Sequence, residues 1–241
     1  MGKAGNGGGQ HPVLPRFPNR APASRRGAVR CGPPQRTAGR ADAAVIFVCR
    51  PPQAVYPAMI PLITHTPRLT LIAASRALLT AELHKPRYFP ILLGAAMPTD
   101  WPPGAYDEAT MHHFLDKLTA GGRTAAGWYG WYALLKATDT TPVTLVGAGG
   151  FLGPPDAAGT AEINYSIATD WRRQGLATEL VAGLVQQAEQ TGMVRQLVAH
   201  TLPHEPAAEE VLRRNGFALA GLAPDGRLRF ERTVEPTPAG A

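Results

Sequence analysis

The segment 161–192 constrains the fold more than any other part of this 241-residue chain, because a strand pattern, a tight turn and a helix pattern follow one another within it. From 162 to 168, apolar and polar residues alternate, which is the period of a half-buried strand. From 176 to 191, apolar residues recur every three or four positions, as on one face of a helix. Gly192 stands where a helix commonly ends with a left-handed residue. This order predicts a domain of mixed α and β structure.

The turn before this helix contains Arg172, Arg173, Gln174 and Gly175. The first amide groups of a helix lack intrahelical partners and can converge on an anion. Gly175 and Ala177 allow a close approach, and the two arginines add positive charge. A phosphate-binding turn is therefore one interpretation. On spacing alone, a basic amphipathic surface helix after a tight turn is an equal alternative.

Three motifs carry a resemblance to a known family. Arg172-x-x-Gly175-x-Ala177 after a strand resembles the acyl-CoA pyrophosphate loop of the GNAT N-acetyltransferases, in which Gln or Arg, two residues, Gly, one residue and Gly or Ala follow in order. The strand 162–167 is similar to the Glu-Ile-Gly-Tyr strand of the ribosomal-protein-alanine (RimJ/RimL-like) branch. The segment 215–217 is similar to the Gly-Phe pair that closes the following helix of that branch.

The resemblance runs from about Thr66 to Thr233, the extent expected for the GNAT domain. It implies a mixed α/β fold with a mostly antiparallel sheet of six or seven strands, flanked by four helices. Its fourth strand, here about 161–168, and its fifth, about 194–201, are expected to splay apart and admit the cofactor.

The resemblance also implies which residues contact acetyl-CoA, the expected co-substrate. Pantetheine would lie along the backbone of Tyr165, Ser166 and Ile167. A backbone amide near Ile167 would polarise the thioester carbonyl. The pyrophosphate would contact the turn and the start of the helix: Arg172, Arg173, Gln174, Gly175, Leu176, Ala177 and Thr178.

The acceptor implied by the resemblance is an amine. Amines are mostly protonated at neutral pH and need a base or a water relay before they attack a thioester. Glu162 is the candidate base, because it lies beside the expected thioester and shares a strand face with Asn164 and Ser166. The alternative is that Glu162 is only a solvated carboxylate at the start of a half-exposed strand.

The chain departs from the family after the second splayed strand. Ala208 stands where relatives have a serine, and Leu212 where many have a tyrosine, so neither common acid for the departing thiolate is present. Water or His204 is left as the proton donor. A non-catalytic acyl-CoA-binding or sensing module with the same fold therefore stays open as an alternative.

Periodicity predicts the other elements of the domain. Helices are expected at 74–84, 107–121 and 207–214, the second with Asp107 as its N-cap, and further strands at 69–72, 128–136, 143–151, 217–220 and 228–233. The aromatic residues of the strand at 128–136 either line a substrate cleft or, as is usual on a sheet, belong to the core: Trp128, Tyr129, Trp131 and Tyr132.

His112 and His113 do not predict a metal site. Adjacent helix positions point about 100° apart, whereas a helical zinc pair needs positions four apart. No metal is therefore expected.

Residues 1–58 differ in composition from the rest of the chain. They hold nine Lys and Arg against one acid, Asp42, giving +8, whereas the remainder carries −2 and the whole chain +6. Their crowded Pro and Gly predict a disordered extension, and a flexible tail is expected at 234–241. Both cysteines, Cys31 and Cys49, lie in the extension, so the domain itself has none. Nucleic-acid binding through the extension is an alternative against which the weakly acidic domain argues.

The chain contains no apolar run long enough to predict a membrane span. The apolar run 43–49 is short and begins too deep in the chain for a signal peptide. We therefore expect a cytoplasmic bacterial N-acetyltransferase that uses acetyl-CoA and acts on a protein N-terminal amine or a small amine. Residues 1–58 are expected to be dispensable, with Met59 as a second start. The acceptor and the oligomeric state, including a homodimer, stay open.

Overall fold

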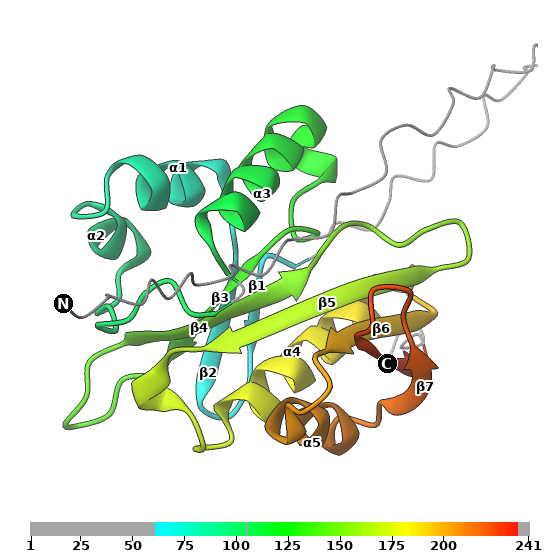
Figure 1. The fold of residues 1–241 in the computed structure, drawn as a ribbon. Helices are drawn as coiled ribbons and strands as arrows, with labels where there is room; N and C mark the ends of the chain where they lie inside the picture. The colour runs from blue at the N-terminus through cyan, green and yellow to red at the C-terminus, as the bar shows by residue number, and fades with distance from the viewer. Residues whose placement is uncertain (1–60, 105, 236–241) are drawn as a thin grey trace, which may run out of the picture. The chain divides into compact units, whose positions relative to one another are not determined.

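The computed structural model describes residues 61–104 and 106–235 (Figure 1). The predictions for the extension, its cysteines, the start at Met59 and residues 236–241 concern positions outside these ranges. Within them, eight strands form one sheet in the order β1-β2-β3-β4-β5-β6-β8-β7. All neighbours are antiparallel except β5 and β6. The strands are β1 (Ile63–His65), β2 (Leu69–Ala73), β3 (Trp131–Leu135), β4 (Thr144–Phe151), β5 (Thr160–Ile167), β6 (Gln196–Thr201), β7 (Ala218–Leu222) and β8 (Leu228–Thr233).

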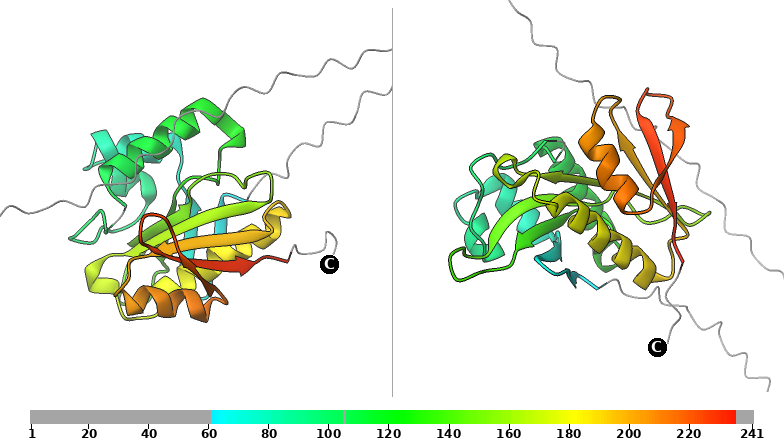
Figure 2. Two further views of the ribbon diagram at one scale, coloured as in Figure 1. Left: turned by 45° about the vertical axis from the view of Figure 1, so that its right-hand side comes forward. Right: turned by 90° about the horizontal axis from the view of Figure 1, so that it is seen from below.

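Helices cover both faces of the sheet. Figures 1 and 2 show α1, α2 and α3 on one side and α4 and α5 on the other. None of the helices in the described ranges is long and apolar enough to cross a membrane. The helices are α1 (Arg76–His84), α2 (Phe89–Leu93), α3 (Glu108–Gly121), α4 (Leu176–Thr191) and α5 (Pro206–Arg214), with short 3-10 turns η1 (Gly122–Thr124) and η2 (Thr169–Trp171).

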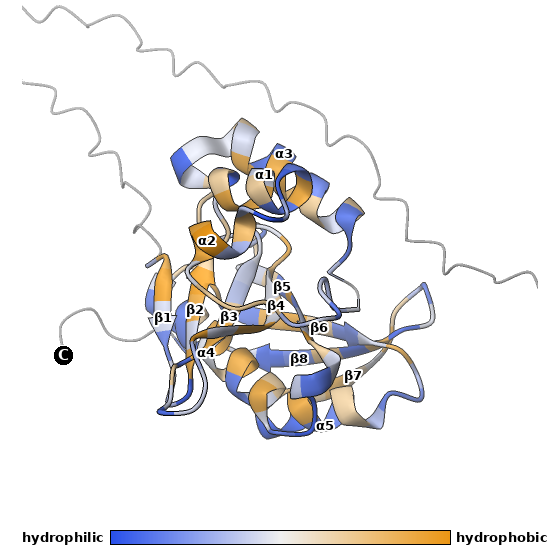
Figure 3. Ribbon diagram, turned by 90° about the vertical axis from the view of Figure 1, so that its left-hand side faces the viewer, coloured by the Kyte–Doolittle hydropathy of each residue, from blue (hydrophilic) through white to orange (hydrophobic). Residues whose placement is uncertain are grey.

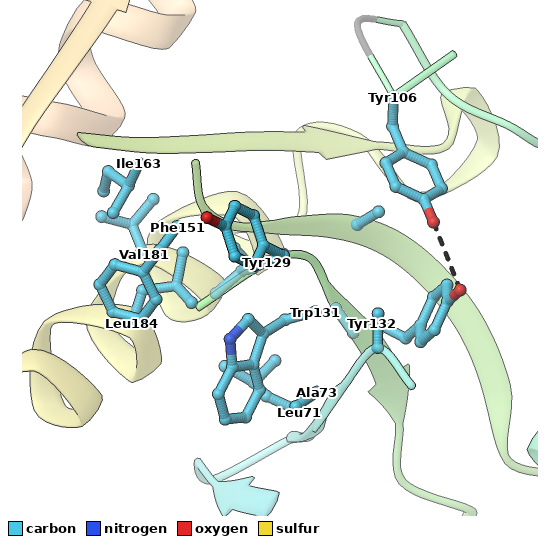
Figure 4. Packing of buried hydrophobic residues seen from close by; sticks show 14 of the residues in the cluster. Leu71, Ala73, Tyr106, Tyr129, Trp131, Tyr132, Phe151, Ile163, Val181 and Leu184 are labelled. Atoms are coloured by element: carbon cyan, nitrogen blue, oxygen red, sulfur yellow. Dashed lines mark hydrogen bonds between the residues drawn. The ribbon is translucent and has the colours of Figure 1, made fainter. Parts of the chain in front are cut away.

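The predicted alternation along β5 separates an apolar face from a polar one. Ile163 and Ile167 are buried, and Figure 4 shows Ile163 beside Val181 and Leu184 of α4. Glu162, Asn164 and Ser166 are only partly buried on the other face of the strand. The core therefore fixes the register of β5, because a one-residue slip would exchange the two faces.

The aromatic residues of the β3 region belong to the core. Trp131 and Tyr132 are each 1% exposed, and Trp128 and Tyr129 are also buried. The interpretation that they line an open cleft is therefore wrong. The prediction that Asp107 caps a helix is confirmed, since its Oδ1 accepts from the Thr110 amide at 2.8 Å.

The strand and helix counts exceed the expected six or seven and four, because two elements are too short to show a period. β1 has three residues and precedes the expected boundary at Thr66. The five-residue α2 begins with Phe89-Pro90, and Figure 3 shows it as strongly hydrophobic. The strand expected from position 128 starts only at Trp131, after glycines with positive φ at 127 and 130. The packed domain continues past Thr233 to Val234, which is 3% exposed.

Candidate active site

β5 is paired with β4 along most of its length but with β6 along only half of it. The parallel pairing begins at Thr160 and ends with Ile163 opposite Ala199, although β6 continues to Thr201. The two strands therefore separate from Asn164 onward. The structure thus has the splay that the family resemblance implied.

The splayed half of β5 turns two residues toward the opening. The Ala168 amide donates to the Val146 carbonyl of β4 at 2.9 Å, and the Glu162 carbonyl accepts from the amide of Leu152, the residue after β4, at 2.9 Å. Because successive residues of an antiparallel strand bond to opposite sides, the backbone groups of Tyr165 and Ile167 point toward β6.

Ser166 differs from the other predicted pantetheine contacts. It lies opposite Ala148, so its backbone amide points toward β4 and not into the opening. A contact between Ser166 and pantetheine stays a prediction, and its backbone amide is not the group that faces the opening.

The predicted anion turn forms an open helix N-terminus. Gly175 is the left-handed N-cap of α4 at φ 77°, and Arg173 also has positive φ, 58°. No side chain caps this helix, so the amides that begin at Leu176 are without an intrahelical partner. The Arg172 Nε donates to the Ile167 carbonyl at 2.9 Å, which ties the turn to the end of β5. Exposed Arg173, Gln174 and Gly175 and half-buried Ala177 and Thr178 complete the turn.

An ion pair that the sequence interpretation did not single out supports this turn. Arg68 Nε lies 2.7 Å from Glu179 Oε2, and its Nη1 donates to the Gln174 carbonyl at 2.9 Å. Burial alone would raise the pKa of Glu179, but hydrogen bonds from Thr66 and Arg68 outweigh it and lower that pKa. Arg68 therefore neutralises a carboxylate in the first turn of α4, beside the open amides. Nothing in the sequence around Arg68, which directly precedes β2, predicts this contact with α4.

Glu162 is not simply solvated. Its Oε1 lies 2.8 Å from Nδ1 of His200, whose side chain is 9% exposed. Both residues point to the same side of the paired half of β5 and β6, because Glu162 lies opposite Val198 and His200 follows two residues later. His200 is a functional candidate that sequence reasoning missed. It lies two residues after Val198, the position opposite Glu162, and this spacing could have revealed it.

The tyrosine of β5 crosses the opening. The Tyr165 hydroxyl donates to the Ala208 carbonyl of α5 at 2.9 Å, and burial, with the nearby charge of Glu205, raises the pKa of this phenol well above its usual range. Leu212, which replaces the tyrosine of relatives, is fully buried. Tyr165 thus links β5 to α5 as a neutral donor. His204, the other proton donor considered from sequence, lies in the turn before α5 with φ 81°.

Three buried side-chain oxygen atoms have no hydrogen-bond partner among the described residues. They belong to Asn164 in the splayed half of β5, Thr201 in the splayed half of β6, and Asp100. Asp100 lies at the same end, since its other oxygen accepts from the Thr169 amide at 2.7 Å. Buried polar groups usually have partners, so these atoms fit a site that is completed by a polar ligand. The open strand edge and helix N-terminus fit an extended cofactor that ends in a phosphate.

A second hollow lies between α4, the end of α5 and β8, but it contains none of the predicted site residues. Its charges are already paired, as in Arg232 with Glu189 at 3.1 Å. Among the described residues, no group of three or more His, Cys, Asp or Glu side chains is arranged for a metal. The splay is therefore the candidate active site.

Comparisons with known proteins agree with this fold. Uncharacterized N-acetyltransferase YjdG of Bacillus subtilis (strain 168) is 28% identical over 127 residues, which cover 53% of this chain and 72% of YjdG. RimL, a ribosomal L7/L12 α-N-protein acetyltransferase solved in complex with coenzyme A, aligns over 74% of this chain and 99% of its own, with a TM-score of 0.50 and 19% identity. A putative ribosomal-protein-serine acetyltransferase from Vibrio cholerae aligns over 73% and 99%, with a TM-score of 0.50 and 17% identity.

At these identities the solved structures establish a shared fold. The family comparison goes further, because residues 76–218 match the family described as Acetyltransferase (GNAT) domain. This match covers more than half of the chain, and the protein therefore belongs to the GNAT acetyltransferase family.

Proposed function

We propose that this protein transfers the acetyl group of acetyl-CoA to a primary amine. One observation carries the proposal: the unpaired edge of β5 runs toward the uncapped N-terminus of α4. Coenzyme A has an amide-containing chain followed by a pyrophosphate. The strand edge can bind the chain, and the helix N-terminus beyond it can bind the pyrophosphate. The solved RimL complex with coenzyme A, which shares the fold, supports the same assignment.

The strand edge would hold the pantetheine arm and the thioester. The Tyr165 and Ile167 backbone groups face the opening, and an extended ligand can bond to them as an added strand does. The Ile167 carbonyl already accepts from Arg172, so its amide is the group left to stabilise the oxyanion. The pyrophosphate would bind the first amides of α4, with Arg173 and Gln174 beside it.

Glu162 is the proposed base for the acceptor amine. His200 fixes its carboxylate at the edge of the opening, at 2.8 Å. No dedicated acid is required at the other end of the reaction. A thiol has a pKa of about 8.5, so a thiolate departs readily and takes its proton from water at neutral pH. The replacements at Ala208 and Leu212 are therefore compatible with turnover.

The acceptor class we propose is a protein N-terminal amine or a small primary amine. The first rests on the shared fold with RimL, which is described as a ribosomal-protein N-acetyltransferase. The second rests on membership of the GNAT acetyltransferase family, which supports an amine acceptor in general.

The test is release of coenzyme A from acetyl-CoA by the full chain, across a panel of primary amines and N-terminal peptides. We expect acetyl transfer to at least one amine and loss of this activity in Gly175→Glu. Tight acetyl-CoA binding without thiol release for any acceptor would instead establish the non-catalytic acyl-CoA-binding module.

A further inference from the structure

A buried carboxylate lies under the helical layer on the α1–α3 side of the sheet. Glu82 of α1 accepts from Trp101 Nε1 at 2.7 Å, from the Tyr106 hydroxyl at 2.9 Å and from the Tyr132 hydroxyl at 2.6 Å. Figure 4 shows the Tyr106 and Tyr132 hydroxyl groups pointing toward each other. The donors come from the loop before α3 and from β3, so two separate segments donate to one carboxylate of α1.

This carboxylate has no cationic partner. Within residues 61–104 and 106–235, no Lys, Arg or His lies within ion-pair distance of Glu82. Burial raises the pKa of Glu82, and its three hydrogen bonds only partly offset the rise. The titratable groups that face it are Tyr106 and Tyr132, whose own pKa values burial raises, so both remain neutral donors. A buried, uncompensated carboxylate attracts a cation.

The sheet connects this cluster to the candidate active site. Tyr132 of β3 lies opposite Ala148 of β4, which lies opposite Ser166 in the splayed half of β5. Neighbouring strands are about 4.8 Å apart, so this row crosses from Tyr132 to Ser166 in about 10 Å. A small cavity lies over the row and is lined by Tyr106, Ala148, Gly149, Asn164, Tyr165 and Ser166.

Two of the polar residues that line this cavity differ in hydrogen bonding: one has a donor that is already used, and the other has an acceptor without a partner. Tyr106 is committed as a donor to Glu82 on its far side. Asn164 has a buried Oδ1 atom that accepts no hydrogen bond from any described residue. A ligand group that donates hydrogen bonds and carries positive charge satisfies both the open acceptor and the carboxylate behind the tyrosine.

We propose that this cavity binds the ammonium head group of the acceptor, with Asn164 Oδ1 as its hydrogen-bond acceptor and Glu82 as the counter-charge that acts through Tyr106. This inference rests on the proposed function, which it deepens by locating the amine. Glu82 is a positioning residue here, whereas Glu162 keeps its place as the base. The cavity volume is about 10 Å³, the space of one water molecule, so it receives only the –NH3+ group and the rest of the acceptor lies outside it.

The proposal fixes how acceptor binding depends on pH. A protonated Glu82 offers no counter-charge, so ammonium affinity is low below its raised pKa. Affinity rises as the pH passes upward through that pKa and Glu82 ionises. Binding below that pKa also releases one proton from Glu82, because the bound cation favours the carboxylate.

The experiment is calorimetric titration of the full chain, saturated with coenzyme A, with n-butylamine between pH 5 and about 8.5, where this amine stays protonated. n-Butanol serves as the uncharged analogue. We expect butylammonium to bind more tightly than butanol, with affinity that rises with pH. Asn164→Leu should weaken binding about tenfold, the effect of losing one hydrogen bond to a charged group. Asn164→Asp, which keeps the acceptor oxygen, should retain binding.

Glu82→Gln should abolish the rise in affinity with pH, whereas the surface variant Glu210→Gln should not change it. Absence of butylammonium binding by the wild type, or equal binding in Asn164→Leu, overturns the proposal. So does a pH dependence that survives Glu82→Gln. Coenzyme A affinity, measured on each variant, reports folding independently. Acetyl transfer by a wild type that fails these binding tests would leave the proposed function intact.

Discussion

The cofactor side and the acceptor side of β5 are built in different ways. The cofactor side uses backbone groups of two adjoining segments, the edge of β5 and the first turn of α4. The acceptor side uses side chains from separate elements, with Glu82 on α1, Tyr106 before α3, Tyr132 on β3 and Asn164 on β5. A backbone site tolerates sequence change as long as the turn geometry persists. A side-chain site changes its ligand with one substitution.

Under these proposals, a substitution on the acceptor side would change the acceptor and leave the cofactor site intact. The anion turn depends mainly on Gly175 and on an uncapped helix, features that are local and independent of the substrate. The cavity depends on which polar side chains face it, and these come from β5 and from the loop before α3. The predictions below test each side separately.

The largest effect is expected where chemistry rather than binding is changed. Glu162→Gln keeps an oxygen that can accept from His200 but cannot take a proton from the amine. We expect turnover to fall by about 100-fold or more, the usual contribution of a general base, with acetyl-CoA affinity retained. The measurement is the pH–rate profile of kcat with saturating acetyl-CoA. A profile identical to that of the wild type removes Glu162 from the mechanism and leaves its contact with His200 as structural.

The next effect tests the backbone-built side. Gly175→Ala places a side chain at φ 77°, and Gly175→Glu adds a negative charge at the anion turn. Strain at such a position costs about 1 to 3 kcal/mol, so Gly175→Ala should weaken acetyl-CoA binding modestly and Gly175→Glu much more. Titration with acetyl-CoA at low and high salt separates backbone strain from the added charge, because salt screens only the effect of the charge. Equal affinities for both variants would show that the pyrophosphate lies elsewhere.

The smallest effect concerns stability and sharpens the account of the acceptor side. The folded-state pKa of Glu82 is raised, so its contribution to the free energy of unfolding is full below the unfolded value of about 4.3 and is lost as pH rises through the folded value. Wild-type stability should therefore fall over this range relative to Glu82→Gln. Urea unfolding at several pH values measures the difference. A constant difference across pH would mean that Glu82 does not titrate on its own in the folded protein.

Sequence reasoning predicted the cofactor side because its signals are contiguous. The alternation of β5, the glycine turn and the period of α4 lie within one segment, and their geometry follows from local conformational preferences. The short β1 and α2 were not predicted, because three and five residues are too few to establish a period.

The residues of the acceptor side were not predicted, for a different reason. In the sequence, Glu82 is a charged residue of a predicted helix, and nothing local predicts that it is buried. The tertiary structure buries it against Trp101 and two tyrosines. Arg68 and His200 likewise gain their partners from residues 111 and 38 positions away. Periodicity predicts which face of an element is buried, but it does not predict which distant side chain lies opposite.

The most direct measurement of the central claim is amide hydrogen exchange along β5, with and without acetyl-CoA. Asn164 and Ser166 already bond to β4, whereas the Tyr165 and Ile167 amides face the opening. We expect acetyl-CoA to slow exchange at Tyr165 and Ile167 and to leave Asn164 and Ser166 nearly unchanged. Unchanged exchange at Tyr165 and Ile167 in the presence of saturating acetyl-CoA would contradict the placement of the cofactor between β5 and β6.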